Sequence, residues 1–98
     1  MITIQASRQN ITVKGHADYS KYGTDIVCAG VSTLLISHYN LMLRFMPESN
    51  FTCTALEGDF RLIIKKLTLE IEKIMDNLLA SLEELALDYP KNIKLERN

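Results

Sequence analysis

Several residue types are scarce in this chain of 98 residues: tryptophan is absent, and cysteine, histidine and proline each occur twice. Two cysteines are too few for the disulfide framework that holds many small secreted domains together. No segment approaches the ~18 consecutive apolar residues of a membrane-spanning helix, and the opening MITIQASRQN lacks the basic region and apolar run of a secretory signal. We therefore expect a cytoplasmic protein that binds no membrane and keeps two free thiols.

An excess of charge of either sign is also missing. The chain has 11 Lys and Arg residues against 12 Asp and Glu residues, which gives a net charge of −1. Most nucleic-acid-binding proteins have a basic excess, so we expect no direct binding of nucleic acid. The hydrophobic content of 47% fits a single domain over residues 1–98. Domains this small often cover spare apolar surface by self-association, which predicts a homo-oligomer.

Apolar and polar residues alternate in several short segments, as in half-buried β-strands. The alternation over residues 2–6 and 11–13 predicts a first β-hairpin, and that over residues 51–55 and 60–64 predicts a second. A short final strand is predicted near residues 93–95. Because each hairpin is followed by a helical segment, the sequence predicts strands and helices in the order ββαββαβ.

Two segments have the period of an amphipathic helix. The first is predicted to begin at Thr24, as N-cap, and to fade between about Asn40 and Pro47. The second opens at Thr68 and ends before Pro90. Its acidic side is expected to be a solvated face rather than a docking surface, and it carries Glu70, Glu72, Asp76, Glu83 and Glu84. The pattern predicts an α+β fold in which two helices pack on one face of a mainly antiparallel sheet.

The segment GHADYSKYGTDIVCAG, residues 15–30, holds one of the two histidines and one of the two cysteines. Cys28 falls in or just after the first turn of the predicted helix, where unpaired N–H groups and the helix dipole favour the nucleophilic thiolate. Cys53 lies instead on the apolar side of a predicted strand, where a thiol behaves as a small inert hydrophobe. The two cysteines are therefore expected to differ in reactivity.

His16 stands at the end of the second predicted strand, and the following loop can return it to the helix start beside Cys28. An imidazole there could form an ion pair with the thiolate and later protonate a leaving amine. From spacing alone, packing for Cys28 and a turn position for His16 are the commoner roles. Asp25 and Ser32 share the helix face of Cys28. Asp25 could orient His16 or cap the helix, and Ser32 could support the site or bond a carbonyl one turn earlier.

A metal site built from His16, Asp25 and Cys28 is a further alternative. The remaining candidate ligand, His38, belongs to no recognised ligand spacing. We therefore expect neither a metal nor another cofactor.

Four further motifs stand out along the chain: Gly15-His16-Ala17, Tyr22-Gly23, Asp25-Ile26-Val27-Cys28-Ala29 with Ser32, and the ending Tyr89-Pro90-Lys91-Asn92-Ile93-Lys94-Leu95. In the order and spacing of the motifs from Gly15 to Ser32, the sequence resembles the ribosomal-processing cysteine proteases known as the Prp family. The ending is similar to the C-terminus of that family, so the resemblance covers essentially the whole chain. The interval from His16 to Cys28 with its surrounding residues is more specific than a lone pair of cysteine and histidine.

The resemblance implies that Cys28 is the nucleophile and His16 its general base and acid, with Asp25 and Ser32 as supporting positions. It implies a homodimer that removes a short N-terminal extension from large-subunit ribosomal protein twenty-seven. The reaction would be acyl transfer, with backbone N–H groups near the helix start holding the oxyanion. Loop positions expected to border the substrate are Gly15, Ala17, Tyr22 and Gly23. The alternative is a non-catalytic, ribosome-associated dimeric binding protein.

Overall fold

A five-stranded sheet and two long helices make up the part of the chain that the computed structural model describes, residues 1–21 and 25–98. The elements are β1 (Ile2–Ala6), β2 (Asn10–Lys14), α1 (Ile26–Met42), the short 3-10 helix η1 (Glu48–Asn50), β3 (Phe51–Leu56), β4 (Asp59–Ile64), α2 (Leu69–Asp88) and β5 (Ile93–Arg97). The predicted order ββαββαβ and the α+β class are confirmed.

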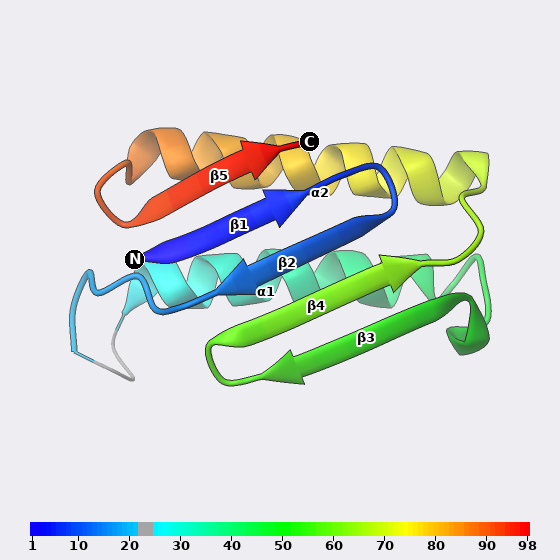
Figure 1. Cartoon of the computed structure of the whole chain (residues 1–98), viewed down its shortest axis with the longest axis horizontal. Helices are drawn as coiled ribbons and strands as arrows, with labels where there is room; N and C mark the ends of the chain where they lie inside the picture. Colours follow the sequence, from blue (N-terminus) through cyan, green and yellow to red (C-terminus); the bar gives the residue numbers. More distant parts are fainter. Residues whose placement is uncertain (22–24) are drawn as a thin grey trace.

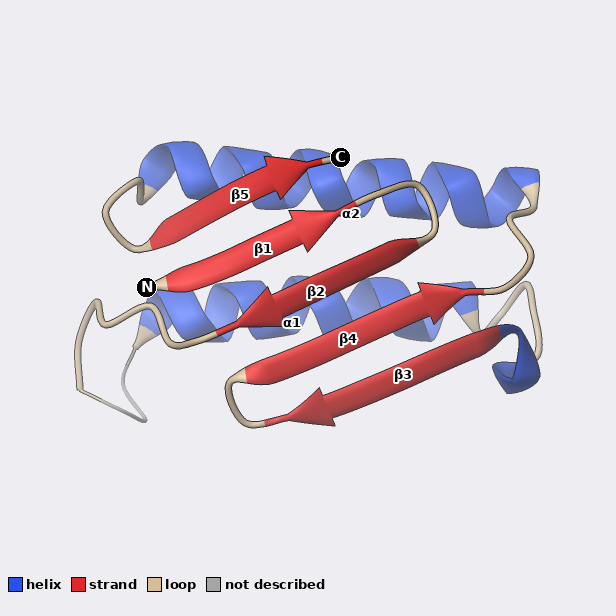
Figure 2. Ribbon diagram, in the orientation of Figure 1, coloured by secondary structure: helices blue, strands red, loops and turns tan. Residues whose placement is uncertain are grey.

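The strands lie in the order β3-β4-β2-β1-β5, and both helices cover the same face of the sheet (Figure 1). Neighbouring strands are antiparallel except at one edge, where β5 runs parallel to β1. Figure 2 shows that the first and last strands lie side by side although most of the chain separates them in sequence. The loop after β2 therefore leaves the sheet close to the start of β5.

The hydrophobic core lies between the sheet and the helices. Alternate residues of the strands point toward the helices, as period-two patterning requires, and the helices turn their apolar stripes toward the sheet. The largest fully buried side chains are Ile4, Ile11, Leu62 and Ile64 from the sheet and Val27, Met42, Ile71, Met75, Leu78 and Leu82 from the helices. This core holds α1, and hence Cys28, in a fixed position against the sheet.

The starts of the two helices differ from the sequence prediction in one respect. Thr68 caps α2 as predicted, since its Oγ1 accepts a hydrogen bond from the Ile71 N–H at 3.3 Å. The predicted N-cap of the first helix, Thr24, lies outside the described residues, and the structure assigns the cap of α1 to Asp25. Asp25 caps the helix because its carboxylate accepts hydrogen bonds from the N–H groups of Val27 and Cys28.

The acidic face of α2 is exposed as predicted, and two of its residues form surface ion pairs. Glu72 pairs with Arg8 at 2.8 Å and Glu83 pairs with Arg97 at 2.8 Å. Exposed pairs of this kind contribute about 0–1 kcal/mol each. Within residues 1–21 and 25–98, no helix is both long and apolar enough to cross a membrane.

Candidate active site

Cys28 is the third residue of α1, and its sulfur lies at the end of the loop that follows β2. The backbone N–H of Ala17 donates a hydrogen bond to Cys28 Sγ over 3.1 Å. Cys53 is half-buried on β3, where burial raises the pKa of its thiol. The structure thus places the two thiols in different surroundings, with a backbone donor at the sulfur of Cys28.

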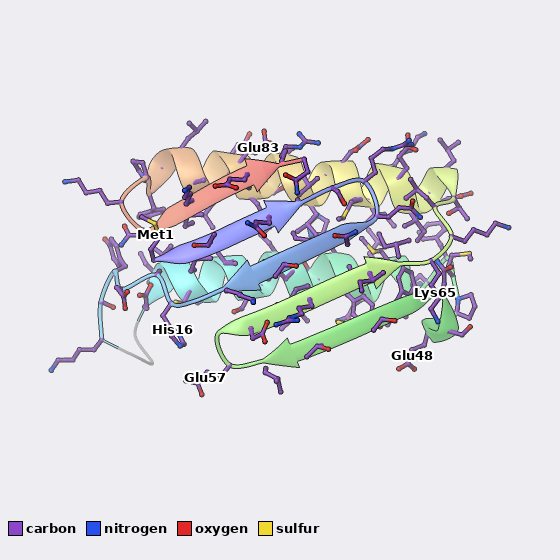
Figure 3. All side chains as sticks on the ribbon, in the orientation of Figure 1. Met1, His16, Glu48, Glu57, Lys65 and Glu83 are labelled. Atoms are coloured by element: carbon purple, nitrogen blue, oxygen red, sulfur yellow. The ribbon has the colours of Figure 1, made fainter. Side chains whose placement is uncertain are left out.

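His16 follows β2 by two residues and is exposed at the end of the sheet where β3 turns into β4. The Gly15 N–H donates to the Gly58 carbonyl over 2.9 Å, which ties this loop to the turn. A Cβ atom added at Gly58 would lie only 3.0 Å from His16 Nε2, so the imidazole lies directly over this glycine. Figure 3 shows His16 near Glu57, a residue of the β3–β4 turn, at one end of the molecule.

His16, Cys28 and Ser32 line two adjoining clefts. The first, of about 250 Å³, runs between α1 and the β3–β4 turn, and its apolar wall includes Leu35 and Phe60. The second, of about 430 Å³, extends toward the loop after β2 and includes Asp18, Ser20, Asp25 and Ala29 in its lining. The structure therefore brings the predicted cysteine, histidine and serine to one place, with open space on both sides.

Asp25 is nearly buried beside this site, and its carboxylate accepts backbone hydrogen bonds from four of the residues that the structure describes. Oδ1 accepts from Val27 at 2.9 Å and from Cys28 at 3.0 Å, while Oδ2 accepts from Tyr19 at 2.9 Å and from Ser20 at 3.3 Å. Burial by itself would raise the pKa of the carboxyl, but these N–H donors outweigh it and hold the pKa below its ordinary value. Asp25 therefore joins the helix start to the loop after His16.

Asp25 accepts hydrogen bonds from two N–H groups at the helix start, where backbone N–H groups were expected to hold an oxyanion. The N–H groups of Val27 and Cys28, at the start of the helix, already donate to the Asp25 carboxylate. The backbone donor that the structure places at the sulfur belongs to Ala17, in the loop after β2. Sequence reasoning missed this because the helix start and its cap compete for the same donors.

The loop positions expected to border the substrate have distinct surroundings. Gly15 has a φ of +95°, and a Cβ there would overlap the Met1 carbonyl oxygen, so the position requires glycine. Ala17 is buried in the core, and its backbone N–H donates to Cys28 Sγ. Tyr22 and Gly23 lie outside the described residues.

Asn92, which sequence reasoning did not single out, also contacts this loop. Its side-chain Nδ2 donates to the Ala17 carbonyl over 2.9 Å from 75 positions away in the chain. Its presence in the C-terminal motif was the available signal, but nothing in the sequence indicated which segment it contacts.

His38, the remaining candidate metal ligand, lies ten residues beyond Cys28 on α1, about 15 Å away along a helix that rises 1.5 Å per residue. Its Nδ1 contacts the Leu34 carbonyl at 2.7 Å and its Nε2 contacts Asn77 at 2.9 Å. In the described part of the chain, no three His, Cys, Asp or Glu side chains are grouped so that they could hold a metal ion.

Residues 1–94 match the family model described as cysteine protease Prp. The chain belongs to the Prp family of cysteine proteases. The resemblance inferred from the motifs around His16 and Cys28 is thereby confirmed, as is the assignment of the protein to the cysteine proteases. The Prp match extends over all five strands except the end of β5.

Known Prp proteins agree with this assignment. The ribosomal processing cysteine protease Prp of Staphylococcus aureus is 31% identical over 90 residues, which cover 88% of this chain and 83% of that protein. A crystal structure of the essential S. aureus protease with a covalently linked product peptide has a TM-score of 0.90 at 28% identity, with both chains covered fully. Its complex with a substrate peptide has a TM-score of 0.80 at 25% identity, again over both whole chains.

Proposed function

We propose that this Prp-family protein is a ribosomal-processing endopeptidase in which Cys28 is the nucleophile and His16 the general base and acid. The observation that carries the proposal is that both residues line the same two clefts. In addition, the Ala17 N–H donates a hydrogen bond to the Cys28 sulfur. A donor at the sulfur favours the thiolate, which is the reactive form. Asp25 supports the pair by fixing the helix start and the loop after His16, and Ser32 lines the clefts one turn beyond Cys28.

The proposed reaction is acyl transfer to sulfur followed by hydrolysis. The Cys28 thiolate attacks the carbonyl carbon of the scissile peptide bond, and the C–N bond breaks as protonated His16 gives its proton to the departing amine. Neutral His16 then takes a proton from water, whose oxygen attacks the thioester and releases the acid product and Cys28. The two clefts give the peptide room on either side of the sulfur.

The proposed substrate is the precursor of a ribosomal protein, with the N-terminal extension of large-subunit protein twenty-seven as the segment removed. The proposal follows the relatives named as ribosomal processing proteases, one of them bound to a substrate peptide. The first cleft has apolar walls from Val13, Leu35, Leu56 and Phe60, which suit apolar side chains of a peptide. We further propose that residues 1–98 act as one domain, as a cytoplasmic homodimer that needs no cofactor.

The deciding experiment follows the mass of a peptide that spans the extension and its junction during incubation with the protein. We expect cleavage at one bond by the wild-type protein and by Cys53→Ala, and a loss of at least ~100-fold in Cys28→Ala and His16→Ala. Cleavage that persists in Cys28→Ala would remove the proposed nucleophile. A wild-type protein that binds the peptide without cutting it would favour the non-catalytic binding protein instead.

The homodimer is tested separately by sedimentation equilibrium of the wild-type protein at several concentrations. A molar mass that rises to twice that of the chain supports the dimer. A mass that stays at that of one chain at every concentration contradicts it.

A further inference from the structure

Asn92 lies just before β5, yet its side chain reaches into the loop that carries His16. Its Nδ2 donates to the Ala17 carbonyl over 2.9 Å. The Asn92 backbone is itself held, because its carbonyl accepts from the Ile2 N–H at 2.8 Å and its N–H donates to the Tyr89 carbonyl at 3.0 Å. An amide anchored in this way can fix the position of the group to which it donates.

Ala17 connects Asn92 to the reacting sulfur. Its side chain is only 1% exposed, its carbonyl accepts from Asn92, and its N–H donates to Cys28 Sγ at 3.1 Å. The two peptide groups that flank the Ala17 Cα are therefore each held by one hydrogen bond. Loss of the bond to Asn92 would release the 17–18 peptide group, and a shift of the Ala17 Cα that followed would also move the N–H relative to the sulfur.

We propose that Asn92 is a positioning residue that orients the Ala17 backbone so that its N–H meets the Cys28 sulfur. The inference rests on the proposed function in so far as Cys28 is taken as the nucleophile. A hydrogen bond donated to a thiolate stabilises the charged form more than the neutral thiol. Asn92 thereby holds a backbone donor at the reacting sulfur without touching the sulfur itself.

The test compares Asn92→Asp and Asn92→Ala with the wild-type protein. Aspartate keeps the shape of the side chain but replaces the donor by a carboxylate that repels the Ala17 carbonyl. Iodoacetamide is added at pH 6 and at pH 9, and the alkylation of Cys28 and of Cys53 is followed separately by peptide mass. For Cys28 we expect the ratio of the rate at pH 6 to that at pH 9 to fall about three- to tenfold in both variants, because the bond to the thiolate is weakened. The ratio for Cys53 should stay within twofold.

A matched control is available at Asn50, a buried asparagine that also holds a loop. Its Nδ2 donates to the Lys66 carbonyl at 3.0 Å and its Oδ1 accepts from the Lys66 N–H at 2.9 Å. Asn50 precedes β3, at the end of the sheet opposite His16, where Figure 3 labels Glu48 and Lys65. Asn50→Asp and Asn50→Ala should lower the thermal midpoint of unfolding and leave the Cys28 ratio unchanged, because they weaken the fold without touching Ala17.

The outcomes separate a positioning role from a structural one. A Cys28 ratio in Asn92→Asp equal to that of the wild type overturns the proposal, as does a parallel change at Cys28 and Cys53. If Asn92→Ala does not fold, the aspartate variant decides. If Asn92→Asp does not fold either, Asn92→Ser takes its place, because the serine side chain is too short to reach the Ala17 carbonyl. In the peptide assay, kcat should fall with KM little changed. Because alkylation needs no substrate, it tests Asn92 even if the peptide is not cleaved, and so distinguishes failure of this inference from failure of the proposed protease reaction.

Discussion

At the scale of single residues, the two cysteines show how local surroundings separate two identical side chains. Cys28 accepts a backbone hydrogen bond at the start of a helix, while burial on β3 raises the pKa of Cys53. Both are half-buried, so exposure does not distinguish them. The difference between them lies in the backbone donor at Cys28 Sγ and in the burial that disfavours the charged form of Cys53.

The expected consequence is an order of alkylation in the wild-type protein. At pH 6.5 and limiting iodoacetamide, Cys28 should be modified roughly ten times faster than Cys53 or more, because only the thiolate reacts and burial disfavours the thiolate of Cys53. Quantitative peptide mass spectrometry gives both rates in one sample. Equal rates, or a faster reaction at Cys53, would contradict the interpretation of the Cys28 environment.

Asp25 predicts a pH dependence of stability. Its pKa in the folded protein lies below the ordinary value of 3.8, so ionised Asp25 stabilises the fold above that value. The contribution is lost as pH falls through the folded-state pKa, because the Asp25 carboxylate of the folded protein then becomes protonated. Asp25→Asn should therefore be less stable than the wild type at pH 7, and the difference should shrink when denaturant unfolding is repeated near pH 3. Asp76→Asn, on the exposed face of α2, is the control and should show no such convergence.

Residue by residue, the sequence predicted which side chains come together at the site better than it predicted the groups that hold them in place. His16, Cys28 and Ser32 could be placed together because a strand end and a helix start meet across a short loop. Asp25 was left between capping and orienting, and its four backbone bonds depend on a loop conformation that no periodicity encodes. Asn92 was missed because its contact with Ala17 spans 75 positions and exists only in the folded sheet.

At the scale of elements, the β3–β4 turn acts as a support for the site. Gly58 has a φ of +69°, a conformation that glycine adopts freely and asparagine tolerates better than other residues. A Cβ at this position would lie 3.0 Å from His16 Nε2, so the imidazole would have to shift by a few tenths of an ångström. The turn thus needs glycine for its backbone and for the imidazole beside it.

Substitutions at Gly58 separate two effects, backbone strain at its positive φ and displacement of the His16 imidazole. Gly58→Ala and Gly58→Asn both add a Cβ against His16, so kcat/KM for the peptide should fall by roughly tenfold or more in each. Gly58→Asn should keep more of the thermal stability, because asparagine accepts the positive φ. Glu57→Ala, in the same turn, should retain near-normal activity, and full activity in Gly58→Asn would show that the imidazole does not depend on this space.

The elements themselves were predictable because each has a pattern with a physical origin. Alternation identified the four hairpin strands, and the stripe of apolar residues identified α2 together with its cap, Thr68. The start of α1 was placed one residue early, at Thr24, because threonine and aspartate both cap helices. Which of them does so is decided by the backbone conformation at the cap.

At the scale of the whole molecule, stability depends on the single layer of apolar side chains between sheet and helices. Leu82 is fully buried in this layer, whereas Leu87, one and a half turns further along α2, is 81% exposed. Leu82→Ala should lower the free energy of unfolding by about 2–5 kcal/mol through lost burial and a cavity. Leu87→Ala should change it by less than about 0.5 kcal/mol. Urea unfolding measures both, and a similar loss in the two variants would contradict the assigned core.

The order of the strands in the sheet could not be predicted from local sequence patterns. Hairpin pairing of β1 with β2 and of β3 with β4 follows from short turns, but the parallel pairing of β5 with β1 joins distant segments. Alternation at Ile93 and Leu95 predicts a strand without indicating its neighbour. That neighbour is what places Asn92 beside Ala17.

The parallel pairing of β5 with β1 also has a consequence for the timing of synthesis. Chains leave the ribosome N-terminus first, so β1 and the His16 loop emerge long before Asn92 has been translated. Until then the Ala17 carbonyl lacks the amide that holds it, and β1 has only β2 beside it. A chain built in this order contains Cys28 and His16 early, but it completes the contacts around Ala17 only when Asn92 has been made, so we expect full activity only after the last strand has formed.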